Sequence, residues 1–169
     1  MKEIIVDLRK INITYLITLV VTIIISIVII IIKNNTVYFK WDWIIILFFL
    51  SVIILHEAIH AIGFIIFAKV PIDKVKFGFH KQYYVPYCSA DGIISKFGYI
   101  SALLLPNILL GSIGLISLFF TNNFLWSLFV AWLVASGSGD YYMLNLVSKY
   151  NNDSRFMDHP IEPGFFVIE

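Results

Sequence analysis

Long apolar runs separated by short polar segments dominate the chain. Residues 11–32 and 97–139 contain no charged side chain, and residues 43–68 contain only one. About 20 helical residues cross a hydrocarbon core of about 30 Å, and a lone segment in lipid satisfies its backbone only as a helix. The pattern therefore predicts an all-α integral membrane protein. Its four transmembrane helices are expected at about 11–32, 43–68, 97–120 and 124–147.

The segments outside these spans are short. Residues 69–96 form the only sizeable connector, and their aromatic and β-branched runs at 75–80 and 83–88 predict a small β-hairpin-like loop. Residues 148–169 form a polar tail, in which 164–168 read either as a strand or as a loosely held terminus. We expect residues 1–169 to form a single membrane-embedded domain.

Composition agrees with a membrane protein. Of 169 residues, 60% are hydrophobic and 14% charged, and the net charge of +1 gives no support for nucleic-acid binding. A single cysteine excludes an internal disulfide.

Basic residues predict the orientation. With the N-terminus inside, ten of the twelve lie on one side, which the positive-inside rule assigns to the cytoplasm. We expect a multi-pass protein of a bacterial cell membrane with both termini cytoplasmic. The ten residues are Lys2, Arg9, Lys10, Lys69, Lys74, Lys76, Lys81, Lys96, Lys149 and Arg155.

The second apolar run contains the motif His56-Glu57-Ala58-Ile59-His60. Residues four apart lie on the same face of a helix, so His56 and His60 can bind one metal ion. Glu57 lies beside them, in the place of the general base of a zincin. Ionisable residues at membrane depth are costly and usually functional. The alternative is a set of buried polar residues that pair only with one another.

One further acid, Asp140, falls inside a predicted span. At 1.5 Å per residue, Asp140 and the two histidines lie at similar depth if the second and fourth spans run the same way. A catalytic zinc needs three protein ligands and one open position. The residues therefore predict a Zn²⁺ site with His56, His60 and Asp140 as ligands and Glu57 as catalytic base.

These residues resemble two groups of proteins. A His-Glu-x-x-His motif on one span and an aspartate on a later span resemble the site-2 class of intramembrane zinc metalloproteases. The whole pattern, with Pro106 in the third span and Gly139-Asp140 late in the fourth, resembles a bacterial domain-of-unknown-function family of zincin peptidases. The resemblance implies zinc-dependent peptidase activity. Site-2 proteases typically carry Asp-Gly, whereas this chain has Gly-Asp.

Two other residues are candidates for substrate binding. The same resemblance implies that Asn107 hydrogen-bonds the substrate backbone, although helix packing beside Pro106 is the stronger alternative. Tyr141 is a candidate donor to an oxyanion, or an anchor at the membrane interface. His80 and Cys88 either form a second metal site or are ordinary loop residues.

The sequence thus predicts a membrane-embedded zinc metalloendopeptidase that cuts a membrane protein or peptide near the cytoplasmic face. The loop strands would pair with an extended substrate. The alternative is a non-proteolytic zinc-binding scaffold or adaptor. A structural site needs no base, so an intact Glu57 favours the enzyme. The oligomeric state stays open.

Overall fold

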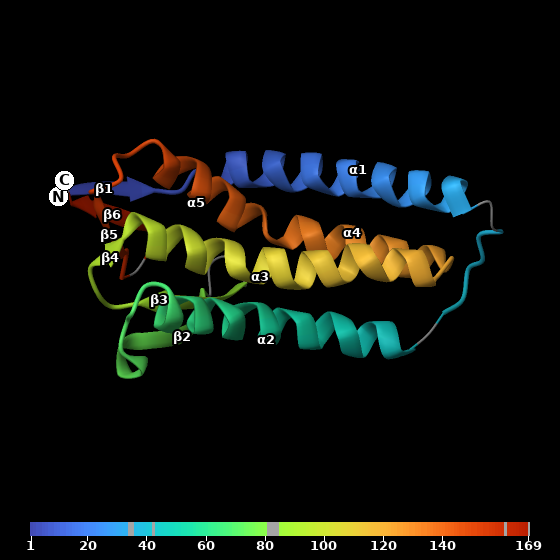
Figure 1. Ribbon diagram of the computed structural model, residues 1–169, viewed down its shortest axis with the longest axis horizontal. Coiled ribbons are helices and arrows are strands. Elements are labelled where there is room, and N and C mark those ends of the chain that lie inside the picture. The colour runs from blue at the N-terminus through green and yellow to red at the C-terminus, as the bar shows by residue number, and fades with distance from the viewer. Residues whose placement is uncertain (34–35, 42, 81–84, 161, 169) are drawn as a thin grey trace.

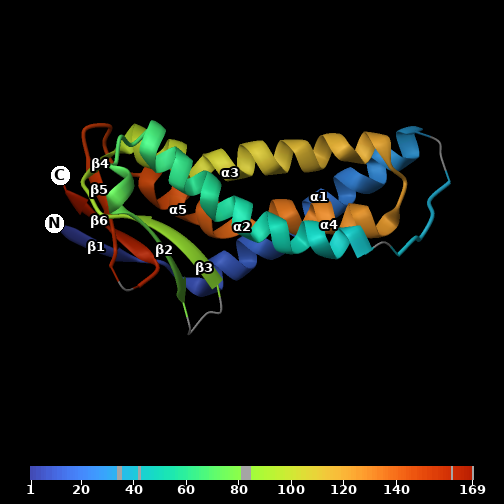
Figure 2. The same ribbon diagram turned by 90° about the horizontal axis from the view of Figure 1, so that it is seen from below.

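The computed structural model describes residues 1–33, 36–41, 43–80, 85–160 and 162–168. Within these residues the helices lie side by side and a sheet lies across one end of them (Figures 1 and 2). The helices are α1 (Leu8–Lys33), α2 (Trp43–Ile66), α3 (Lys96–Ser117), α4 (Phe124–Ser136) and α5 (Ser138–Ser148), with short 3₁₀ turns η1 (Ile72–Lys74) and η2 (Leu118–Phe120). The strands are β1 (Lys2–Ile5), β2 (Val75–His80), β3 (Val85–Ala90), β4 (Ile94–Ser95), β5 (Arg155–Asp158) and β6 (Gly164–Ile168).

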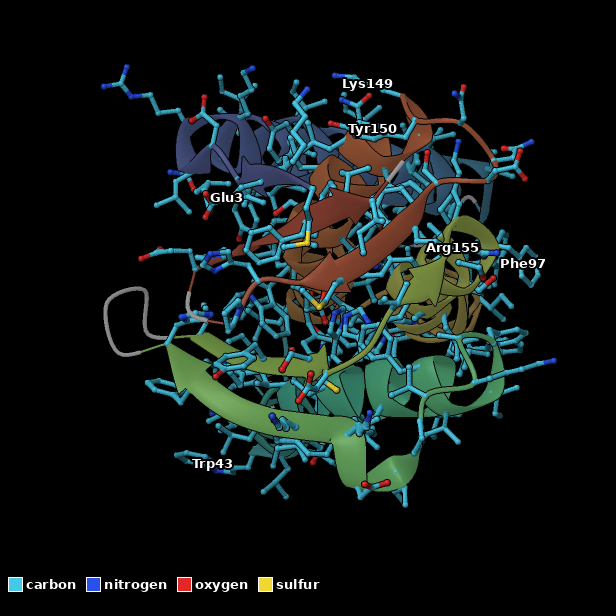
Figure 3. All side chains as sticks on the ribbon, turned by 90° about the vertical axis from the view of Figure 1, so that its left-hand side faces the viewer. Glu3, Trp43, Phe97, Lys149, Tyr150 and Arg155 are labelled. Atoms are coloured by element: carbon cyan, nitrogen blue, oxygen red, sulfur yellow. The ribbon has the colours of Figure 1, made fainter. Side chains whose placement is uncertain are left out.

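The prediction of an all-α protein is wrong. The residues before α1 and after α5, together with β4 just before α3, form an antiparallel sheet with strand order β1-β6-β5-β4. Alternate residues of its strands turn inward, and Phe156, Phe165 and Val167 are at most 1% exposed. The sheet thus buries apolar side chains that the tail would otherwise leave in water. Figure 3 views this end of the molecule, with Glu3 on β1 and Arg155 on β5 labelled.

The second sheet is the predicted hairpin. Strand β2 has the expected bounds, and β3 pairs with it antiparallel from Val85 opposite His80 to Ala90 opposite Val75. The predicted second strand, 83–88, therefore ends two residues too early, since β3 continues to Ala90. Its first two residues, and the expected turn at 81–82, lie outside the described residues.

Within the described part of the chain, three helices are long and apolar enough to cross a membrane, namely α1, α2 and the continuous α3–η2 segment that ends at Phe120. The predicted fourth span is not one helix, because it breaks at Gly137 into α4 and α5. A Cβ at Gly137 would overlap the side chain of Asn107 on α3. The break thus occurs where the chain passes closest to a polar residue of its neighbour.

The helices pack in two groups, one of α1, α4 and α5 and one of α2 and α3, and α3 joins the two groups. Helix α1 packs on α4 and α5, α2 packs on α3, and α3 also contacts both α4 and α5. Thr22 and Ser26 are the buried residues of α1, and each hydroxyl donates to the carbonyl four residues earlier at 2.8–2.9 Å. A second close approach joins α2 and α3, since a Cβ at Gly63 would lie 2.8 Å from the Cα of Ala102.

Candidate metal centre

The two histidines of the motif converge on one point. They lie one turn apart on α2, and their Nε2 atoms are 3.1 Å from each other. His60 is buried, whereas His56 is partly exposed. Each ring therefore directs its Nε2 atom toward the same small space.

Asp140 closes this group from α5. Its carboxylate places Oδ2 3.1 Å from Nε2 of His56, and Oδ1 3.3 Å from Nε2 of His60. Ligand atoms in a tetrahedral zinc site with bonds of about 2.0–2.1 Å stand about 3.4 Å apart. The spacing and the donor types fit a metal ion bound by two imidazoles and a carboxylate.

The orientation of His60 depends on a proline. Pro106 has no N–H, so the carbonyl of Ala102, four residues earlier in α3, lacks its usual helical donor. Nδ1 of His60 lies 2.9 Å from this carbonyl. A carbonyl only accepts a hydrogen bond, so Nδ1 of His60 carries the proton. Its Nε2 then presents a lone pair to the interior of the cluster formed by His56, His60 and Asp140.

Asn107 supports Asp140. Its Nδ2 donates to Oδ2 of Asp140 at 2.8 Å and lies 3.3 Å from the carbonyl of Leu103. Because Gly137 has no Cβ, the Asn107 side chain can reach across to α5. The described contact is thus with a cluster residue, and the expected contact between Asn107 and a substrate stays a prediction.

Glu57 lies beside the cluster without joining it. The backbone amide of Cys88 on β3 faces its carboxylate, and both residues line the same cavity. Among the described residues that offer ligand atoms at metal-binding distance, the cluster contains only His56, His60 and Asp140. Glu57 therefore remains available for a separate chemical task.

A cavity of about 750 Å³ surrounds these groups. Its wall is formed by the first turns of α1, the motif face of α2, strand β3, Gly139 and Asp140 of α5, and the turn between β5 and β6. Apolar side chains contribute most of this wall. A mostly apolar cavity that contains a few polar groups is typical of a ligand-binding site.

The remaining predicted residues lie further from the cluster. The Tyr141 hydroxyl donates to the carbonyl of Val134 at 3.4 Å, so its expected role toward a substrate stays a prediction. His80 packs against the ring of Tyr87, with 4.4 Å between ring centroids. Burial, with the nearby charges of Glu57 and Asp158, raises the pKa of the Cys88 thiol to about 12, so this thiol is protonated at neutral pH.

Sequence reasoning missed Asp158. Its Oδ1 accepts from the hydroxyl of Tyr99, which is fully buried, and its Oδ2 accepts from the amide of Ala90 at 2.8 Å. Burial raises the pKa of this carboxyl to about 6. The only signal in the sequence was an acid within a strand-like stretch of the tail.

Comparison with known proteins agrees with the geometry. No curated protein and no solved structure matches the chain. Residues 49–155 match a protein family described as "Putative zincin peptidase". This segment contains α3, α4, α5 and the hairpin, together with the part of α2 that carries His56 and His60. A match over more than half of the chain shows that the protein belongs to this zincin peptidase family.

Proposed function

We propose that the protein is a membrane-embedded zinc endopeptidase that hydrolyses peptide bonds of membrane proteins or peptides near the cytoplasmic face. The observation that carries the proposal is the convergence of His56, His60 and Asp140 at metal-binding distances, with Glu57 beside them in one cavity. Membership in the zincin family and three apolar helices of spanning length support it.

Each residue has a distinct role. His56, His60 and Asp140 would hold the zinc ion, which supplies a Lewis acid that acidifies water and polarises a carbonyl. Glu57 takes a proton from the attacking water and passes it to the leaving amine. The Cys88 amide, which faces the Glu57 carboxylate, would help to hold it for both transfers.

The contacts around the ligands favour a preorganised site. The Ala102 carbonyl fixes the tautomer of His60, and the Asn107 amide fixes one oxygen of Asp140. Such outer contacts typically change metal affinity or activity 10- to 100-fold when they are removed. They support a site built to bind metal rather than a chance group of polar side chains.

The distribution of charge supports the orientation. Both ends of the described chain lie at the sheet end of the molecule, where β1 pairs with β6 (Figure 1). Nine of the described basic residues belong to segments at this end and two, Lys33 and Lys40, to segments at the other end. We therefore place the sheet, the hairpin and the cavity mouth at the cytoplasmic face of a bacterial membrane.

Metal analysis beside an activity assay tests this function. The purified protein should bind one zinc ion and cleave members of a quenched fluorogenic library of apolar peptides in detergent micelles. Glu57→Gln should keep zinc and lose cleavage, because an amide accepts no proton, whereas Asp140→Asn should lose zinc as well. Asp153→Asn, at an exposed residue outside the cavity, is the matched control.

Two outcomes would reject the proposal. Full cleavage by Glu57→Gln would show that another group is the base. A parent protein that binds zinc stoichiometrically but cleaves neither the library nor co-expressed membrane proteins would instead be the zinc-binding scaffold.

A further inference from the structure

Two carboxylates, those of Glu57 and Asp158, face the edge of strand β3 that does not pair with β2. Amide groups along a strand point alternately to its two sides. The amide of Asp91, which follows β3, donates to the carbonyl of Lys74 on the β2 side. The amides of Cys88 and Ala90 point the opposite way. The Ala90 amide donates to Asp158 at 2.8 Å, and the Cys88 amide faces Glu57. The next position along this edge is Pro86, which has no N–H.

This arrangement changes the role expected of the hairpin. A substrate that added a strand to this edge would need the amides of Cys88 and Ala90 as donors. It would then have to displace Glu57, the proposed base. The edge is therefore better suited to hold the base than to bind an extended peptide.

Asp158 connects three separate elements. It lies on β5, and its two oxygens accept from Ala90 on β3 and from Tyr99 on α3. Tyr99 is fully buried among Phe64, Phe156 and Phe165, so its hydroxyl has a fixed position. Ala90 is 1% exposed and lies only two residues beyond Cys88, whose amide contacts Glu57.

We propose that Asp158 is a positioning residue that, through the Ala90 amide and the Tyr99 hydroxyl, holds β3 where the Cys88 amide reaches Glu57. The role deepens the proposed peptidase function and rests on it. Asp158 lies beyond residues 49–155, the segment that matches the family, so the C-terminal sheet contributes to the site from outside that segment.

Cys88 supplies a readout that does not need activity. It is the only cysteine of the chain, so alkylation by a maleimide reports on β3 without background. Burial raises the pKa of its thiol to about 12, which makes the parent protein slow to react. Loosening of β3 would expose the thiol and accelerate alkylation.

Three variants distinguish the effect of the Asp158 hydrogen bonds from the effect of its negative charge. Asp158→Ala removes both acceptors. Asp158→Asn removes the charge but keeps an oxygen for the Ala90 amide and an amide group that can donate to the Tyr99 oxygen. Tyr99→Phe keeps the charge and removes one of the two contacts. Asp91→Asn is the matched control, because Asp91 is an exposed carboxylate that directly follows β3 and pairs with Lys76.

The expected results follow from the geometry. Asp158→Ala should keep zinc, lower kcat about 10- to 100-fold with KM within about twofold, and accelerate alkylation of Cys88 about tenfold. Tyr99→Phe should also lower kcat and accelerate alkylation of Cys88, each by a smaller factor than Asp158→Ala. Asp158→Asn should retain most of kcat, and Asp91→Asn should match the parent in both assays.

Several results would overturn the proposal. One is a folded, zinc-bound Asp158→Ala with parental kcat and parental alkylation. Another is a loss of kcat in Asp158→Asn as large as in Asp158→Ala, which would assign the effect to charge. A rise in KM alone would make Asp158 a substrate contact. If Asp158→Ala does not fold, parental behaviour of Tyr99→Phe would reject the role. Should the parent lack peptidase activity, alkylation still tests whether Asp158 positions β3.

Discussion

His60 donates a hydrogen bond to the backbone carbonyl that Pro106 leaves without a helical donor. That carbonyl belongs to Ala102, and it lies 2.9 Å from Nδ1 of His60. Gly63, one turn beyond His60, allows α2 and α3 to approach closely at this point. A break in the hydrogen bonding of one helix thus fixes the tautomer of a candidate ligand on another.

Pro106→Ala should therefore weaken zinc binding while it strengthens α3. The new amide would compete with His60 for the Ala102 carbonyl, and we expect zinc affinity to fall about 10- to 100-fold. The apparent melting temperature of the zinc-free protein should rise, because α3 regains a helical hydrogen bond. Competition with a chelator and thermal unfolding in detergent measure the two effects. Ile113→Ala, at an exposed position on the same helix, should neither lower the zinc affinity nor raise the apparent melting temperature.

Gly137→Ala should disturb the cluster, whereas Gly139→Ala should not. A Cβ at Gly137 would overlap the Asn107 side chain, but a Cβ at Gly139 would have no neighbour within 4 Å. The overlap should displace Asn107 from Asp140 and reduce zinc affinity by about tenfold or more. Zinc titration of the two variants tests this expectation. Equal affinities would show that Asn107 does not support Asp140.

The pH dependence of stability should contain a contribution from Asp158. Burial raises its pKa from an ordinary value near 3.8 to about 6 in the folded protein. The folded state thus holds this proton more tightly than the unfolded state, so its contribution is fully present below about pH 4 and is lost as the pH rises through 6. In Asp158→Asn that decline should disappear. Thermal unfolding of the parent and of Asp158→Asn between pH 4 and 8 measures the difference. If stability changes with pH in the same way in both proteins, the pKa of Asp158 is not raised.

Reporter fusions test the orientation. Fusions after Ile32 should report the outer side of the membrane, and fusions at the C-terminus should report the cytoplasm. The expectation rests on the distribution of ten basic residues against two. An external C-terminus would reverse the orientation and move the proposed peptidase site to the other face.

Strong local patterns were predictable from the sequence. A helix brings residues 56 and 60 together whatever surrounds them, and an aspartate in an otherwise uncharged run needs a partner. The positions of α1, α2 and α3 follow from uninterrupted apolar runs. The same reasoning missed the break at Gly137, because an apolar run reveals nothing of a side chain that crosses from another helix.

The sheet was less accessible to sequence reasoning. Strand β1 lies among charged residues, and its partner β6 is more than 150 residues away along the chain. Pairing over that separation depends on the fold and not on local preference. Asp158 could not be recognised for the same reason, since its partners Ala90 and Tyr99 belong to distant elements.

The central place of β6 between β1 and β5 imposes an order of assembly. During synthesis β1 emerges first and stays unpaired until the chain beyond α5 has left the ribosome. His56, His60, Asp140 and Asp158 all precede β6 in the chain, so the sheet that contains Asp158 is complete only when β6 pairs with β1 and β5. In the proposed peptidase, the residues that would bind the metal are therefore all synthesised before the last strand of the sheet that supports Asp158.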